Sequence, residues 1–105
     1  MREVDLATFA VGHSDGAMVI DVREPFEYLG GHVSDAELIP MGQLAARVAD
    51  LPRGVPVYLI CASGNRSLAA GYLTGAGVDA WSVAGGTDAW RRAGHPTVRG
   101  THAIA

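Results

Sequence analysis

The chain contains no lysine: all eight of its basic residues are arginines, and its formal net charge is −3. The absence of lysine excludes Schiff-base catalysis and the phosphate-binding lysine of a P-loop. No run of basic residues occurs, so neither nucleic acid nor an anionic membrane surface is expected as the main partner. No apolar run approaches the roughly 18 residues of a membrane span, and no secretory signal is visible at the N-terminus.

Cysteine is almost as scarce, because Cys61 is the only one in the chain. A single cysteine excludes an internal disulfide, a C-x-x-C redox pair and a multi-cysteine zinc site. His13, His95 and His102 lie too far apart in the sequence to show metal-ligand spacing. We therefore expect no metal and no organic cofactor. We expect the cytoplasm as the location, because a reactive thiol survives in a reducing compartment.

The length and composition fit one domain with one sizeable core: 105 residues, 49% hydrophobic and 18% charged. Short apolar strands alternate with helical segments along most of the chain. This order predicts an α/β fold with a central parallel sheet and helices on both faces. We expect strands at residues 18–22, 36–39, 57–60 and 80–83. We expect helices or helical turns at 6–11, 23–29, 41–49, 68–76 and about 87–93, and a frayed tail at 97–105.

Three loops each follow a predicted strand directly: 21–24, 61–67 and 84–86. Because the carboxyl ends of parallel strands meet at one edge of a sheet, ligands bind beyond that edge. The sequence therefore predicts a pocket where these three loops converge. Gly85 and Gly86 are expected to form a tight turn that lets the loop of Cys61 lie close by, while Asp5 and Thr87 are expected to cap the first and last helices.

Cys61 lies between the most apolar predicted strand and the start of a helix. A loop at a helix N-terminus directs several backbone N–H groups at one point, which favours an anion such as a thiolate. The alternative is an inert cysteine that only fills space in the core. A packing cysteine does not need a polar loop that contains a glycine, so we take Cys61 as the candidate nucleophile. The candidate substrate-binding residues are those that follow it: Ala62, Ser63, Gly64, Asn65, Arg66 and Ser67.

Arg66 occupies the first turn of its helix, where a cation is mildly unfavourable, so an anionic partner is expected nearby. That partner is either the substrate or an internal carboxylate such as Asp21 or Glu24, and the sequence leaves both open. Asp21, Arg23 and Glu24 form a charged cluster at a strand end, in which Asp21 beside Arg23 is expected to hold the loop in place. His32 is expected to be a hydrogen-bonded loop residue rather than a general base.

Several segments together resemble the rhodanese (sulfurtransferase) homology domain, in the family's order and over about residues 4–94. They are Asp21-Val22-Arg23-Glu24-Pro25, Glu27-Tyr28, Gly31-His32-Val33, Ile39-Pro40, Cys61-Ala62-Ser63-Gly64-Asn65-Arg66-Ser67, Gly85-Gly86 and Ala89-Trp90. The resemblance implies a single rhodanese domain over residues 1–105. It also implies that Cys61 carries sulfur as a persulfide, with residues 62–67 as the loop around it and Asp21, Arg23, Glu24 and His32 in support.

The chain departs from the family's pattern at three positions. Asp35 stands where the family usually has glycine, and Leu38 stands where it often has asparagine or histidine. Ala62 follows the cysteine directly, whereas many members have arginine there. The first two positions belong to a supporting loop. The third removes a positive charge from the pocket and leaves open the preference for thiosulfate over other donors.

Cysteine-dependent phosphatases, one class of which is similar to rhodaneses in fold, place five residues between cysteine and arginine. Here only four residues lie between Cys61 and Arg66. A smaller ring of N–H groups suits one added sulfur better than a tetrahedral phosphate, so phosphatase or arsenate reductase activity is disfavoured.

We therefore expect a thiosulfate sulfurtransferase-like enzyme that moves sulfur from a small donor to cyanide or a thiol, including a protein cysteine. A non-catalytic interaction module or a persulfide sensor is the alternative. The physiological donor, the acceptor and the oligomeric state are left open by the sequence.

Overall fold

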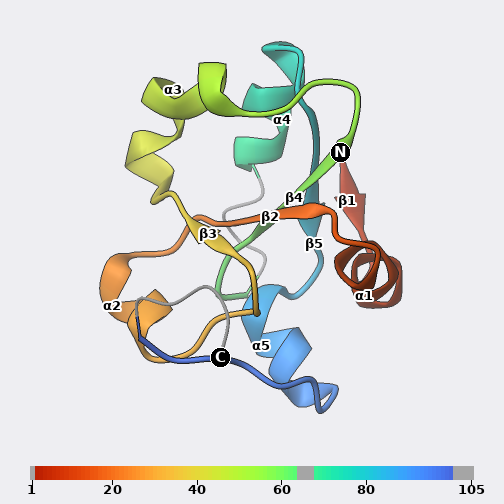
Figure 1. The fold of residues 1–105 in the computed structure, drawn as a ribbon, viewed down its shortest axis with the longest axis vertical. Coiled ribbons are helices and arrows are strands. Elements are labelled where there is room, and N and C mark those ends of the chain that lie inside the picture. Colours follow the sequence, from red (N-terminus) through yellow and green to blue (C-terminus); the bar gives the residue numbers. More distant parts are fainter. Residues whose placement is uncertain (1, 64–67, 101–105) are drawn as a thin grey trace.

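The computed structural model describes residues 2–63 and 68–100. Its centre is a five-stranded parallel sheet in the order β1-β5-β4-β2-β3 (Figure 1). The strands are β1 (Glu3–Val4), β2 (Met18–Asp21), β3 (Glu37–Leu38), β4 (Pro56–Ile60) and β5 (Asp79–Val83). The helices are α1 (Leu6–Ser14), α2 (Pro25–Leu29), α3 (Leu44–Arg47), α4 (Leu68–Gly75) and α5 (Gly86–Arg92). The predicted α/β class with a parallel sheet is confirmed.

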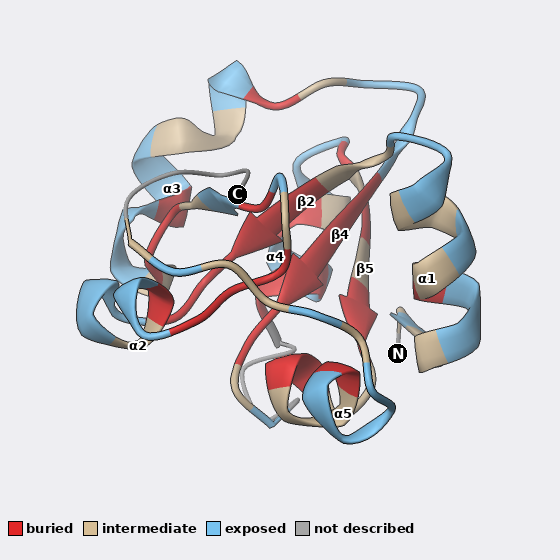
Figure 2. Ribbon diagram, turned by 60° about the horizontal axis from the view of Figure 1, so that its bottom comes forward, coloured by how far each residue is buried: buried red, intermediate tan, exposed pale blue. Residues whose placement is uncertain are grey.

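The side chains of β4 alternate between two apolar cores, one on each face of the sheet. Val57 and Leu59 pack with residues of α3 and α4. Tyr58 and Ile60 pack instead with Phe9 of α1 and with residues of α2 and α5. Figure 2 shows the central strands buried between these helices, as predicted for helices on both faces. The alternation continues past the end of β4 and brings the Cys61 side chain into the core of α3 and α4.

The first helix is longer than predicted, since α1 continues through Gly12 to Ser14. Gly12 serves packing rather than termination: a Cβ there would lie 2.7 Å from the ring of Tyr58. The predicted cap is confirmed, because Oδ1 of Asp5 accepts a hydrogen bond from the backbone N–H of Thr8 at 2.7 Å. Hydrogen bonds from Thr8 favour the ionised carboxylate and so lower the pKa of Asp5.

The single helix predicted at 41–49 is wrong. The segment consists of α3 flanked by two 3₁₀ turns, η1 (Met41–Gln43) and η2 (Val48–Asp50). The 3₁₀ geometry is visible at the start, where the N–H of Gln43 donates to the carbonyl of Pro40 at 2.8 Å. Apolar residues spaced three apart lie on one side of a 3₁₀ turn as well as of an α-helix, so their spacing did not separate the two.

The predicted cap of the last helix is also wrong. Gly85, with φ 74°, is the N-cap, and Thr87 lies inside α5. The backbone N–H of Thr87 donates to the carbonyl oxygen of Cys61 at 2.7 Å, so the first turn of α5 contacts the Cys61 loop. The hydroxyl Oγ1 of Thr87 is buried and has no hydrogen-bond partner among the described residues.

The ends of the chain hold two further departures. Strand β1, which is too short to show an alternating pattern, was not predicted, yet it pairs with β5. Part of the predicted tail is paired as well, because His32 and Val98 exchange two backbone hydrogen bonds and the N–H of Gly100 donates to Leu29. Residues 101–105 lie outside the described residues. Within the described ranges, no helix is both long enough and apolar enough to cross a membrane.

Candidate active site

Cys61 lies directly after β4, at the carboxyl edge of the sheet. Its side chain is only 3% exposed and belongs to the core that includes Ala69 and Ala70 of α4. Exposure rises immediately along the loop, since Ala62 is partly buried and Ser63 is exposed. The thiol is thus a buried group at the start of a loop that leads to the surface.

The first turn of α5 is hydrogen-bonded to this loop. Backbone N–H groups of Thr87 and Asp88 donate to the carbonyl oxygens of Cys61 and Ala62, at 2.7 and 2.9 Å. The approach is so close that a Cβ at Gly86 would run into the Cys61 carbonyl and lie 2.8 Å from the carbonyl of Ala62. The expected close approach of the glycine turn to the Cys61 loop is confirmed, and Gly86 is the residue that permits it.

These two carbonyls also determine where the next two amides point. In a trans peptide the N–H points opposite to the C=O of the same peptide unit. Since the carbonyls of Cys61 and Ala62 face α5, the N–H groups of Ala62 and Ser63 face away from it. The Cys61 side chain likewise lies on the side of α3 and α4, away from α5. Two backbone donors and the thiol therefore share one side of the loop.

The end of β2 carries a buried ion pair that lies one strand away from this loop. Nη2 of Arg23 lies 2.8 Å from Oδ2 of Asp21 and also donates to the carbonyl of Gly31 at 2.8 Å. Asp21 is fully buried and Arg23 is 3% exposed, so the pair replaces the water that both charges lose. The N–H of Val22 donates to the carbonyl of Ile60 at 3.0 Å, which joins this segment to the residue before Cys61.

Glu24 is exposed and begins α2, and its backbone N–H donates to Oε1 of Glu27 at 3.0 Å. His32 is fully buried, with its ring stacked on that of Tyr28 at 3.6 Å. Nδ1 of His32 lies 2.8 Å from the carbonyl oxygen of Tyr28, and because a carbonyl only accepts, Nδ1 carries the proton. Glu24 and His32 are thus tied to α2 by these contacts.

Four of the predicted site residues, Gly64, Asn65, Arg66 and Ser67, lie outside the described residues. Among the described site residues, five converge at the carboxyl edge of neighbouring strands β2 and β4: Asp21, Arg23, Cys61, Ala62 and Ser63. Glu24 and His32 lie instead at the start of α2 and after its end. No three His, Cys, Asp or Glu side chains come together as possible metal ligands in the described part of the chain.

Sequence reasoning missed the donors on Thr87 and Asp88. The signal was a glycine pair that follows a strand and opens a helix, which was interpreted as a turn rather than as the start of α5. Helix starts present N–H groups without partners inside the helix, and these are the groups that hold the Cys61 loop. The class of protein that emerges is an α/β domain with one thiol at the carboxyl edge of its parallel sheet.

Comparison with known proteins agrees with this class. The family model described as a rhodanese-like domain matches residues 7–93. An uncharacterized protein of Synechocystis is 39% identical over 87 residues, which cover 81% of this chain, and the match spans only 49% of that relative's length. Thiosulfate sulfurtransferase GlpE of Pseudomonas putida is 35% identical over 79 residues, with 73% of this chain and 72% of GlpE covered.

The crystal structure of a rhodanese-related protein from Thermoplasma volcanium matches with a TM-score of 0.85 at 33% identity. The match covers 93% of this chain and 98% of that one. The chain belongs to the rhodanese-like domain family.

Proposed function

We propose that the chain is a rhodanese-type sulfurtransferase in which Cys61 carries the transferred sulfur as a persulfide. The observation that carries the proposal is the direction of the loop: the N–H groups of Ala62 and Ser63 face the side on which the Cys61 thiol packs. Such donors stabilise a thiolate and then the negative terminal sulfur of a persulfide. The similarity to GlpE, a thiosulfate sulfurtransferase, supports the same chemistry.

In the first step the Cys61 thiolate attacks the outer sulfur of a donor such as thiosulfate. A new S–S bond forms at Sγ while the S–S bond of thiosulfate breaks, and sulfite leaves with the bonding electron pair. In the second step an acceptor attacks the terminal sulfur and returns Cys61 to the thiolate. Cyanide then becomes thiocyanate, and a thiolate becomes a persulfide. The two half-reactions constitute covalent, ping-pong catalysis without a metal or an organic cofactor.

The proposal gives the remaining site residues specific tasks. Residues 62–67 surround the transferred sulfur, and Arg66 either binds an anionic donor or holds the loop. Asp21 and Arg23 fix the end of β2 beside Ile60, which keeps the strand that leads to Cys61 in place. Glu24 and His32 help to order α2 through these hydrogen bonds. We place the activity in the cytoplasm, where a reduced thiol persists.

The decisive test is the intact mass of the protein after incubation with thiosulfate. We expect a gain of one sulfur atom that is lost again on addition of cyanide, with thiocyanate formed in equal amount. Cys61→Ser is the matched control and is expected to gain nothing. An unchanged mass of the unaltered chain with thiosulfate, glutathione persulfide and polysulfide would contradict the proposal.

The burial of Cys61 favours a second candidate, an interaction domain that binds a partner without sulfur transfer. A thiol that is 3% exposed in an apolar core has the surroundings of an inert packing cysteine. The rate of alkylation by iodoacetamide at neutral pH separates the two, because an inert cysteine reacts no faster than a buried thiol in an unrelated core. Turnover of an aryl phosphate without sulfur transfer would instead select a phosphatase.

A further inference from the structure

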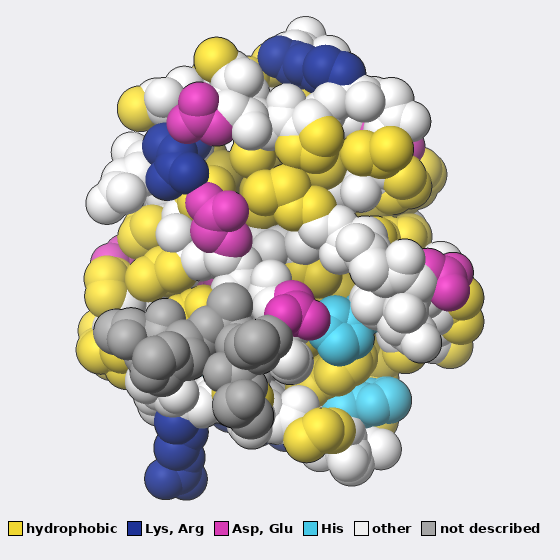
Figure 3. Space-filling view, in the orientation of Figure 1, with side chains coloured by type: hydrophobic (Ala, Val, Ile, Leu, Met, Phe, Trp, Pro, Cys, Tyr) yellow, Lys and Arg dark blue, Asp and Glu magenta, His cyan; other side chains and the backbone are white. Residues whose placement is uncertain are grey.

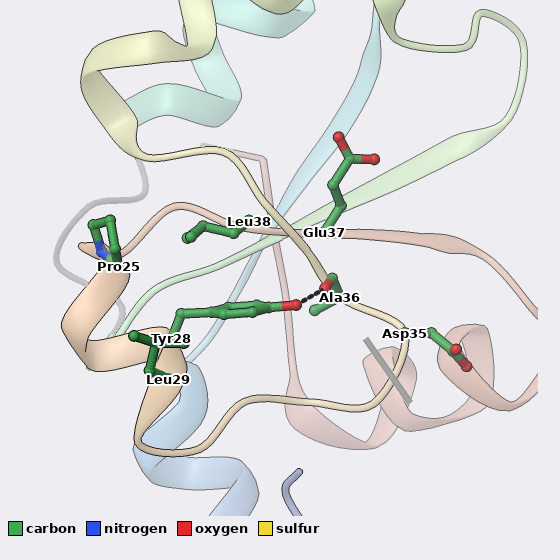
Figure 4. A pocket seen from close by; sticks show the side chains of 7 residues that line it. All are labelled: Pro25, Tyr28, Leu29, Asp35, Ala36, Glu37 and Leu38. Carbon is green, nitrogen blue, oxygen red and sulfur yellow. Dashed lines mark hydrogen bonds between the residues drawn. The ribbon is translucent and has the colours of Figure 1, made fainter. Parts of the chain in front are cut away.

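A groove of about 520 Å³ runs between α2 and β3. It is lined from α2 by Pro25, Tyr28 and Leu29 and from the β3 side by Asp35, Glu37 and Leu38. Figure 4 shows the ring of Tyr28 crossing the groove, and its hydroxyl donates to the carbonyl of Ala36 at 2.6 Å. This bond joins α2 to the residue before β3, so the floor of the groove is formed without a partner.

One wall of the groove is apolar and uncovered. Leu29 is 43% exposed, and Phe26, three residues earlier on α2, is 75% exposed. Residues three apart lie on the same face of a helix, so the two side chains form one surface. Figure 3 shows hydrophobic side chains gathered over α2 at the left of this face. A partner that covers this wall removes apolar surface from water, which favours binding.

The other wall is acidic. The two charged residues that line the groove are Asp35 and Glu37, and Figure 3 shows acidic side chains over and beside β3. Arg47 pairs with Oε2 of Glu37 at 2.8 Å, but no ion pair to Asp35 occurs among the described residues. The charge of this wall therefore complements a partner with Lys or Arg side chains rather than an acidic one.

Backbone groups complete the surface. Among the described strands β3 is the last at its edge of the sheet. The N–H of Ile39 donates inward to the carbonyl of Asp21, and because backbone groups alternate along a strand, those of Leu38 point outward. An extended peptide pairs with outward groups of this kind at a sheet edge.

We infer that this groove binds an extended segment of a partner protein in which apolar side chains alternate with Lys or Arg. The apolar side chains lie against Leu29 and Tyr28, the basic ones face Asp35, and the backbone pairs with Leu38. A segment of about six residues spans roughly 20 Å in extended conformation.

The groove also lies near Cys61. Leu38 and Ile60 pair with Asp21 from opposite sides, so they are two strand spacings, or about 10 Å, apart. A partner held in the groove therefore has its adjoining chain beside the loop that carries the thiol. Binding itself needs no sulfur chemistry, so it stands or falls independently of the proposed transfer reaction.

The test uses the full chain labelled with nitrogen-15 and the synthetic peptide Ac-Arg-Val-Lys-Val-Arg-Val-NH₂. We expect saturable shifts of the backbone amide signals of Leu29 and Leu38. The peptide Ac-Glu-Val-Glu-Val-Glu-Val-NH₂ is the charge control and is expected to bind at least about tenfold more weakly. Absence of site-specific shifts with the basic peptide, or equal binding of both peptides, overturns the proposal.

Variants test each wall separately. Leu29→Lys is expected to weaken binding at least about tenfold. Val55→Lys, at a similarly exposed valine before β4, is expected to leave it unchanged. Asp35→Asn is expected to weaken binding about threefold, less so at high salt, and asparagine keeps the positive φ of this position. Cys61→Ser is expected to bind like the unaltered chain. Weakening by Val55→Lys as large as that by Leu29→Lys contradicts a specific site.

Two other occupants give different results, and each would overturn the proposal. A second copy of the chain would shift the signals of Phe26 and Leu29 with increasing protein concentration in the absence of peptide. If residues 101–105 of the same chain occupied the groove, protein concentration would not shift these signals. Ile104→Asp would then change the signals of Phe26 and Leu29 in the absence of peptide.

Discussion

Thr87 is a residue whose backbone and side chain have different surroundings. Its N–H donates to the carbonyl of Cys61 at 2.7 Å, whereas its Oγ1 is buried with no hydrogen-bond partner among the described residues. A buried hydroxyl without a partner costs about 1–3 kcal/mol. The contact with the Cys61 loop is made by the backbone and does not require the hydroxyl.

We predict that Thr87→Val raises the free energy of unfolding by about 1 kcal/mol, because valine keeps the branched shape and removes the unsatisfied oxygen. Urea unfolding measures the change. Thr74→Val is the matched control in α4: Oγ1 of Thr74 donates to the carbonyl of Ala70 at 2.8 Å, so its loss should not stabilise the protein. A decrease in stability for both variants would contradict the prediction.

The backbone conformation of Asp35 could be predicted from the family resemblance but not from composition. Its φ is 69°, in the left-handed region that favours glycine, and the family resemblance indicates glycine at this position. Aspartate tolerates this region better than most residues. Asp35 therefore combines a glycine-like backbone conformation with an acidic side chain that lines the groove beside β3.

At the level of elements, the start of α5 and the loop after β4 form one unit. Two backbone hydrogen bonds join them, and Gly86 lies against the carbonyls of Cys61 and Ala62. A side chain at position 86 would therefore displace backbone rather than a flexible side chain.

We predict that Gly86→Ala lowers the free energy of unfolding by at least about 3 kcal/mol and prevents or slows sulfur loading of Cys61. Gly94→Ala is the matched control at the far end of α5, because Gly94 also has a positive φ, 89°, but nothing lies within 4 Å of its added Cβ. Backbone strain alone should cost that variant about 1–2 kcal/mol. Urea unfolding gives the stabilities, and intact mass gives the loading. Equal losses in the two variants would show that the contact with the Cys61 loop is unimportant.

The sequence predicted the central strands well, because β2 and β4 are mainly apolar runs with residues buried on both faces, and β5 also sends side chains into both cores. It did not predict β1, whose two residues carry no pattern. It also merged η1, α3 and η2 into one helix, since spacings of three and four do not distinguish the turn types. Local patterns thus identified the buried elements, which require apolar residues. They failed for elements of only one or two turns or of two residues.

Over the whole molecule, the sequence predicted which distant segments lie close together but not the hydrogen bonds that join them. The convergence of loops 21–24, 61–63 and 84–86 follows from the parallel sheet, so it could be predicted. Which amide donates to which carbonyl depends on the exact start of α5 and could not. The charged pair of Asp21 and Arg23 was expected to hold its loop, and the structure adds its third partner, the carbonyl of Gly31.

Ionisation of Tyr28 makes the free energy of unfolding depend on pH. Burial raises its pKa above the usual value of 10.0, and the negative charges of Asp21 and Glu37 add to the rise. The fold therefore prefers the neutral phenol. The contribution to stability is complete below the pKa of the unfolded chain, near 10.0, and is lost as the pH rises through the higher pKa of the folded protein.

We predict that urea stability falls more steeply between about pH 9 and 11 for the unaltered chain than for Tyr28→Phe, which has no phenol to ionise. The other tyrosines are common to both proteins, so the difference between the two curves reports Tyr28 alone. Parallel curves over this range would contradict the prediction.

The two outermost strands, β1 and β3, contain only two residues each. A fibril grows when long flat borders of exposed backbone stack without limit, and borders this short offer too few groups for such stacking. The same molecule that accepts one short peptide at β3 is therefore expected to resist amyloid-like polymerisation, even at the high concentrations at which proteins with long bare borders precipitate.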